Sequence, residues 1–206
     1  MTGWLLPLFP LNVVLFPGIE LPLHIFEERY KEMISECISG KSEFGVVLLQ
    51  QRSLENTGCA AYVADVIKRY EDGRMDIVTR GSRRFEIISL NQEKEYLRGE
   101  PQFFDDEPSP PVNDSTRMEA IRLYEAAKSI LRLDEADLSQ GSRHEQLSYQ
   151  IAGRLPLDLA FKQSLLPLRS EAERLASVIS YLTKLIENVT KAAKARAKAG
   201  LNGHGR

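Results

Sequence analysis

Cysteine is scarce in the sequence: only Cys37 and Cys59 occur among 206 residues, and no C-x-x-C pair is present. Two isolated thiols cannot form a disulfide framework, and they lack the ligand spacing of a cysteine zinc site. We therefore expect both to be small buried hydrophobic residues of a protein from a reducing compartment. No motif in the sequence predicts a bound metal ion or a cofactor.

Long uninterrupted hydrophobic segments are also absent. Residues 4–23 are mostly apolar, but prolines at positions 7, 10, 17 and 22 divide them, and no Lys or Arg precedes them. A membrane-spanning helix needs about 20 apolar residues, and a signal peptide needs a basic start followed by an unbroken apolar stretch. The sequence therefore predicts a cytoplasmic protein without a membrane span.

The familiar catalytic motifs are missing, including G-x-S-x-G and H-E-x-x-H. Gly40-Lys41-Ser42 resembles the end of a phosphate-binding loop, but Ser35 stands where that motif needs its first glycine, and a predicted helix precedes it. We interpret the tripeptide as the turn that ends the helix. The three histidines are far apart in sequence, and His24 lies in an apolar segment, which favours an interior position over a ligand role.

Carboxylates are plentiful, but no two form a recognisable acid–base pair. Glu27 and Glu28 stand at a predicted helix start, where negative charge is favourable, and Asp72 is a turn residue. Arg83 and Arg84 are interpreted as solvated residues at a strand edge, which basic side chains commonly protect.

The net charge of −2 hides an asymmetry along the chain. Residues 1–112 carry 12 basic and 18 acidic side chains, whereas residues 113–206 carry 15 and 11. The last 19 residues contain five basic side chains and no acidic one. Because no folded part has a strong basic excess, the charge pattern disfavours a dedicated nucleic-acid-binding protein. The basic end of the chain is expected to be flexible and to serve solubility.

The first 104 residues have the pattern of a β domain interrupted by one helix. Asp72-Gly73 lies between two β-like runs and predicts a hairpin, since both central turn positions favour positive φ. Gly81 is expected to end the second of these runs, and Gly40 is expected to end the helix. This series of short strands predicts a compact barrel or curled sheet. The predicted strands are 5–9, 13–16, 21–25, 44–49, 60–70, 74–80, 84–90 and 96–104, and the helix is 26–38, with Phe26 on its apolar face.

The apolar period becomes helical beyond a Pro-rich and acidic linker at residues 105–115. Helices are predicted at about 116–133, 143–154 and 158–166, with a last helix that begins near Glu171 and frays after Val189. Hydroxyl and Glu side chains three residues apart predict capping boxes at three of these starts; the pairs are Thr116/Glu119, Ser142/Glu145 and Ser170/Glu173. We therefore divide the chain into a β domain (1–104), a linker (105–115), a helical bundle subdomain (116–190) and a basic tail (191–206).

An ordered series of motifs resembles the N-terminal domain of the Lon protease family. The motifs are Leu6–Leu11, Val14–Gly18, Leu21–Tyr30, Gly45–Val47, Gly58–Ala61, the Asp72–Arg74 hairpin and Gly81–Phe85, and they cover about residues 5–104. The later helices are similar to the helical extension of that family, more weakly. The resemblance implies an α+β protein, in which a PUA-like β pseudo-barrel with one inserted helix is followed by a C-terminal helical subdomain.

The resemblance also implies a role in recognising polypeptides. Full Lon proteases carry an ATPase module and a serine–lysine peptidase module, and the sequence contains neither, so no catalytic residue is carried over. We hypothesise a non-catalytic module that binds unfolded or partner polypeptides, as an adaptor or chaperone-like factor in protein quality control, with a separate ATP-dependent protease as a candidate partner. The predicted contact surface comprises Phe16, Pro17, Leu23, Phe26, Arg29, Tyr30, Tyr70 and Arg74.

Two other functions stay open at this point. PUA-like folds also occur in RNA-binding proteins, although the acidic first domain disfavours this alternative. A peptidase is the third hypothesis, and it rests on association with the family alone. The oligomeric state is open as well.

Overall fold

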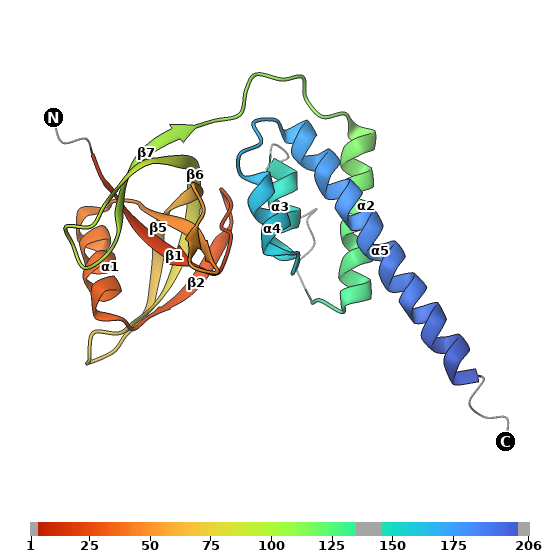
Figure 1. Ribbon diagram of the computed structural model, residues 1–206, viewed down its shortest axis with the longest axis horizontal. Helices are drawn as coiled ribbons and strands as arrows, with labels where there is room; N and C mark the ends of the chain where they lie inside the picture. Colours follow the sequence, from red (N-terminus) through yellow and green to blue (C-terminus); the bar gives the residue numbers. More distant parts are fainter. Residues whose placement is uncertain (1–3, 135–145, 202–206) are drawn as a thin grey trace. The chain divides into compact units, whose positions relative to one another are not determined.

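The computed structural model describes residues 4–134 and 146–201, with side chains up to residue 193. Contacts divide the chain into two compact units, Met1–Glu107 with Pro156–Arg169, and Pro108–Leu155 with Ser170–Arg206. The first unit contains the β barrel that is seen in Figure 1. Its elements are β1 (Leu6–Leu11), β2 (Glu20–Ile25), α1 (Glu28–Gly40), β3 (Phe44–Gln50), β4 (Ser53–Leu54), β5 (Thr57–Arg69), β6 (Met75–Asn91), β7 (Arg98–Phe104) and α4 (Leu159–Leu165).

The sheet of the first unit closes on itself. Its strand order is β1-β7-β6-β5-β3-β4, and β3 returns to β1 through a parallel pairing in which Phe9 lies opposite Val46. β2 lies off this path and pairs antiparallel with the first part of β6. Closure removes most free strand edges, which otherwise invite pairing with other chains. The predicted α+β pseudo-barrel with one inserted helix is confirmed.

Two hydrophobic clusters stabilise this barrel from opposite faces of its sheet. The larger cluster includes Phe9, Phe44 and Ile77 together with Met33 of α1. The smaller cluster is built around Leu8, Val47 and Phe85. The alternating side chains of β3 enter both clusters, so this strand is buried on both faces, as its continuous apolar run predicts.

Gly81 does not end a strand, contrary to the sequence-based expectation. β6 runs without interruption from Met75 to Asn91, and it contains both predicted strands, 74–80 and 84–90. The Phe16–Ile19 loop crosses it at Gly81, whose N–H donates to the Ile19 carbonyl at 2.9 Å while its own carbonyl accepts from the Gly18 N–H at 2.9 Å. A Cβ at Gly81 would lie 2.2 Å from the Phe16 carbonyl oxygen. Glycine therefore permits a close backbone approach here.

The start of the barrel also differs from expectation. Residues 13–16 form a buried loop instead of a strand. The helix begins at Glu28, so Phe26 precedes it and is exposed. Its end is confirmed as a turn, but Lys41, not Gly40, adopts the left-handed conformation (φ 48°) and donates its N–H to the last carbonyls.

A buried arginine fixes the returning segment 156–169 to the barrel. Arg84 of β6 is only 4% exposed, and its guanidinium donates to the carbonyls of Leu166 (2.9 Å) and Leu168 and to Asp106 Oδ1 (2.6 Å). The Gln163 amide adds a bond to the Thr57 carbonyl at 2.8 Å. The sequence-based interpretation of Arg84 as a solvated edge residue is therefore wrong, although its neighbour Arg83 is exposed. Through these contacts α4, which the sequence pattern grouped with the later helices, belongs to the first unit.

The second unit contains α2 (Asp114–Leu131), α3 (Leu147–Arg154) and α5 (Glu171–Leu201). α2 and α5 lie side by side in Figure 1. The Asn113 side chain, rather than Thr116, caps α2 by accepting from the Thr116 N–H at 2.8 Å. Ser170 Oγ accepts from the Glu173 N–H at 3.5 Å, and the predicted Ser142/Glu145 cap lies outside the described residues. α5 continues to Leu201, beyond the point where fraying was expected.

Charged residues inside the second unit are hydrogen-bonded. Arg174 is fully buried, and its guanidinium donates to Glu171 Oε2 at 2.9 Å and to Ser148 Oγ at 3.2 Å. The Glu171 carboxylate also accepts from the Ser148 N–H at 2.9 Å. Among the helices described, none combines the length and the apolar character that a membrane crossing requires.

The close approach at Gly81 makes a direct prediction. Gly81→Ala should lower the free energy of unfolding by about 1–3 kcal/mol, because the new methyl group overlaps backbone atoms that cannot move without breaking the loop contacts. Urea denaturation followed by circular dichroism measures this loss. Gly40→Ala is the matched control, because a Cβ there meets only ordinary contacts and a helix gains from alanine. Equal stability of the two variants would contradict the role assigned to Gly81.

The contacts of Arg84 predict a second pair of outcomes. Arg84→Ala should cost roughly 2–3 kcal/mol, because it leaves buried carbonyl acceptors without donors, and amide exchange in Leu159–Leu165 should accelerate. Arg83→Ala is the control, since Arg83 forms an exposed ion pair with Glu43 and such pairs contribute less than about 1 kcal/mol. Unchanged exchange in α4 of the Arg84 variant would show that other contacts hold the segment.

Candidate functional site

The tip of the β5–β6 hairpin is a tight turn with one left-handed residue. The Gly73 N–H donates to the Tyr70 carbonyl at 3.0 Å, and the Tyr70 N–H donates to the Arg74 carbonyl at 2.9 Å. Gly73 has φ 83°, whereas Asp72 keeps a negative φ, so only one of the two turn positions is left-handed. This geometry is a type I turn followed by a glycine bulge. Asp72 stabilises it by accepting from the Arg74 N–H.

Aromatic and charged side chains gather beside this turn because β2 pairs with β6. The register places His24 directly opposite Asp76. His24 Nδ1 lies 2.6 Å from Asp76 Oδ1, and the Tyr70 hydroxyl donates to Asp76 Oδ2 at 2.7 Å. The His24 ring meets the edge of Tyr70, with ring centroids 5.9 Å apart. The His24 side chain is 44% exposed, so the predicted interior histidine is wrong.

Phe26 presents an apolar ring to solvent within the same cluster. It is 60% exposed, and it stacks on His24 with a centroid distance of 6.0 Å. Lys68 Nζ and the Arg74 guanidinium lie 4.4 and 5.0 Å from the Tyr70 ring centroid, as cation–π contacts. We call this cluster the hairpin surface; it comprises His24, Phe26, Lys68, Tyr70, Arg74 and Asp76.

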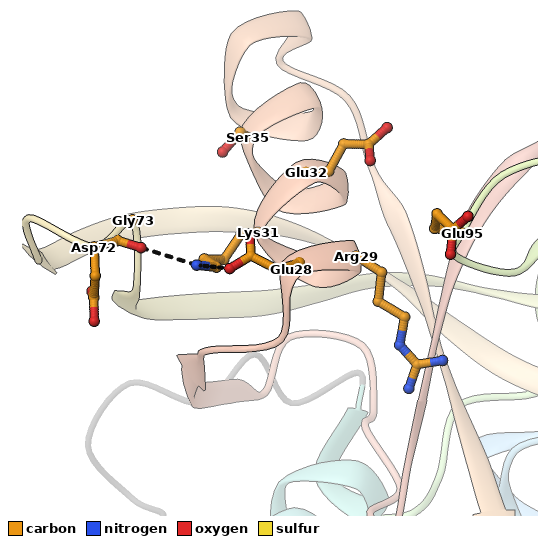
Figure 2. A pocket seen from close by; sticks show the side chains of 8 residues that line it. All are labelled: Glu28, Arg29, Lys31, Glu32, Ser35, Asp72, Gly73 and Glu95. Carbon is orange, nitrogen blue, oxygen red and sulfur yellow. Dashed lines mark hydrogen bonds and ion pairs between the residues drawn. The ribbon is translucent and has the colours of Figure 1, made fainter.

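A polar pocket of about 490 Å³ adjoins the turn, between the hairpin and the exposed side of α1. Figure 2 shows Lys31 pointing from α1 to the hairpin, where its ammonium group donates to the Asp72 carbonyl at 2.9 Å and pairs with Glu28. Four of the six charged residues that line it are acidic; the lining residues are Glu28, Arg29, Lys31, Glu32, Ser35, Asp72, Gly73 and Glu95. Its charge therefore complements cations better than phosphates.

The eight residues predicted as a contact surface are not all accessible. Phe16, Pro17 and Tyr30 are buried, and Tyr30 packs on Phe9 with ring centroids 4.2 Å apart. Leu23 is half-buried against the main core.

The other four predicted residues reach the surface. Phe26, Tyr70 and Arg74 come together in the hairpin surface, and Arg29 lines the adjacent pocket. The sequence-based prediction missed His24 and Asp76, which only the pairing of β2 with β6 brings into contact, and it missed Lys68, which lies opposite Asp76 in the β5–β6 pair.

Hydrogen bonds within the hairpin surface shift two pKa values. The bond from His24, and then that from Tyr70, lowers the pKa of the Asp76 carboxyl. The same bond to Asp76 raises the pKa of the Tyr70 phenol, because ionised tyrosine cannot donate it. In residues 4–134 and 146–201, no three His, Cys, Asp or Glu side chains gather in a way that could hold a metal ion.

The fold and the site together describe a β pseudo-barrel that presents an aromatic and charged surface at the tip of one hairpin. The chain matches the family described as the ATP-dependent protease La (LON) substrate-binding domain over residues 5–184, and it belongs to that family. The resemblance inferred from the sequence motifs is thereby confirmed.

Relatives and solved structures agree with this assignment. The chain is 32% identical over 113 residues to a Lon protease of Parabacteroides distasonis, covering 51% of the chain and 14% of the relative. It is 26% identical over 198 residues to Lon protease 2 of Syntrophobacter fumaroxidans, covering 89% and 25%. A crystal structure of a Lon N-terminal domain protein from Xanthomonas campestris has a TM-score of 0.68 at 26% identity, covering 86% of this chain and 98% of that one. The chain thus spans a quarter or less of the length of these two Lon proteases.

The bonds to Asp76 predict a measurable change in the titration of Tyr70. In Asp76→Asn the pKa of Tyr70 should fall towards the ordinary tyrosine value of about 10, as followed by NMR of the ring carbons. The pKa of Asp76 is lower in the folded chain than in the unfolded one, so its stabilising contribution is present above about pH 4 and lost as the pH falls further. Tyr62 serves as the internal reference, and an unchanged Tyr70 titration would refute the bond.

Proposed function

We propose that this chain is a non-catalytic polypeptide-binding module that recognises unfolded or partner polypeptides through the hairpin surface. The proposal extends the family assignment, which is to the substrate-binding part of an ATP-dependent protease. We further propose that it acts as an adaptor or chaperone-like factor, with a separate ATP-dependent protease supplying unfolding and cleavage. The exposed Phe26 ring is the observation that carries the proposal.

The chemistry of the hairpin surface suits a polypeptide of mixed sequence. Unfolded chains expose hydrophobic side chains, and the Phe26 ring offers an apolar surface against which such a side chain can be buried. Lys68 and Arg74 flank the Tyr70 ring and can meet acidic side chains or carbonyl groups. The adjacent pocket, with its acidic excess, suits basic side chains. Binding of this kind is tolerant of sequence, because no single contact dominates it.

The test measures binding of reduced and carboxymethylated α-lactalbumin, which is permanently unfolded, by fluorescence anisotropy. Phe26→Ala should weaken binding about fivefold, because about 1 kcal/mol of apolar burial is lost. Met118→Ala on α2 is the matched control: Met118 is 64% exposed, similar to Phe26, but lies outside the hairpin surface.

Three results would contradict the proposal. The first is no binding of the unfolded probe up to high micromolar concentration. The second is an equal effect of the Phe26 and Met118 variants, which would leave the hairpin surface without a role. The third is cleavage of the probe, or of casein, by the purified chain without ATP.

A further inference from the structure

Half of β5 has a hydrogen-bonded neighbour on one side only. β6 pairs with β5 from Thr57 to Arg69, whereas β3 pairs only with Cys59–Ala61. Among the described residues, the backbone of 62–68 makes hydrogen bonds only within the β5–β6 pair. Although the barrel closes elsewhere, this stretch is therefore an open edge whose N–H and C=O groups can pair with another extended chain.

A groove of about 470 Å³ runs beside this open edge, between β5 and the end of α1. Its apolar lining comes from Ile38 and Cys37 of α1 and from Val63 and Val66 of β5. Ile38, Val63 and Val66 also pack against the main hydrophobic core. The groove is thus a shallow extension of the core, which suits an apolar side chain.

Two charges of opposite sign line the same groove. They belong to Lys41, at the left-handed end of α1, and to Asp65 of β5. Within the described part of the chain, neither side chain forms an ion pair or a side-chain hydrogen bond. An extended segment with an apolar residue between an acidic and a basic one would complement both charges while its backbone meets the edge.

We infer that the open edge of β5 binds an extended segment of the recognised polypeptide by β-strand addition, with an apolar side chain in the groove. This inference rests on the proposed function and assigns it a second contact at residues 62–67, none of which belongs to the hairpin surface. The added strand is short, because bulges at Ala64 and Ile67 interrupt the β5 ladder on either side of Asp65–Val66. Recognition therefore combines a few backbone bonds, which are independent of sequence, with one pocket that selects an apolar residue.

Amide hydrogen exchange tests the inference with the unfolded lactalbumin probe. A saturating probe should slow exchange in 62–67 at least threefold, because strand addition protects edge amides. Ala64→Trp, which fills the groove from an exposed position, should abolish this protection. Ile88→Trp is the matched control, because Ile88 is an exposed strand residue of β6 that does not line the groove. If urea denaturation shows that the Ala64 variant is destabilised, Lys41→Glu replaces it and should reduce probe affinity about threefold.

Each other outcome decides against the inference. Probe binding without protection of 62–67 would overturn the strand addition and leave the hairpin surface as the contact. The absence of any probe binding would overturn both proposals. Protection that appears without probe, and increases with protein concentration together with a dimer mass, would identify a second copy of this chain as the occupant.

Discussion

The close backbone approach at Gly81 allows one continuous strand, β6, to pair with different neighbours in the two halves of the barrel. β6 pairs with β2 through its first part and with β7 through its last part, while β5 pairs with it from Met75 to Glu86. The loop before β2 crosses β6 at Gly81. Any side chain at this position would overlap the Phe16 carbonyl. The continuity of β6 in turn fixes the register that brings His24 to Asp76, and it places Arg84 where it can bind the returning segment. Both the candidate surface and the docking of α4 thus depend on one glycine.

Both proposed contact regions lie along the β5–β6 hairpin, although His24 and Phe26 come from β2 and the residue that follows it, and their chemistry differs for a structural reason. Near the turn, Met75 and Ile77 enter the main core, whereas Asp76 lies on the opposite face of β6, so Tyr70 and Asp76 are stabilised by polar bonds and remain accessible. Farther along β5, Val63 and Val66 still reach the core, and the open edge lies against apolar side chains. A polypeptide that contacts both regions would meet a surface tolerant of sequence at the hairpin surface and a pocket selective for an apolar residue beside the open edge of β5. Two weak contacts on one folded unit also gain affinity from their high effective concentration.

Sequence patterns predicted the elements better than their pairing. The apolar run of β3 and the helical period of α1 were sufficient to predict these two elements, because the pattern of buried positions within an element depends on the residues of that element. The merger of two predicted strands at Gly81 and the contact of His24 with Asp76 depend on residues more than fifty positions apart. Arg84 was misplaced for a similar reason, because two of its three acceptors are main-chain carbonyls, which no side-chain pattern reveals. Of the candidate surface, Phe26, Tyr70 and Arg74 were among the residues predicted from the family resemblance and the apolar N-terminal stretch, whereas the same reasoning also selected Phe16, Pro17 and Tyr30, which are buried.

A binding module with exposed apolar groups must also avoid binding itself. The open edge of β5 is interrupted by two bulges, and its exposed apolar residues, Tyr62 and Ile67, are separated along the strand. Such features weaken edge-to-edge pairing between copies of a protein, and the same features limit how tightly any added strand can bind. Weak binding agrees with the proposed role, because a factor that passes polypeptides on must release them. The bulges would therefore limit the affinity of the β5 edge for an added strand. This limit both reduces self-association and allows a bound polypeptide to be released.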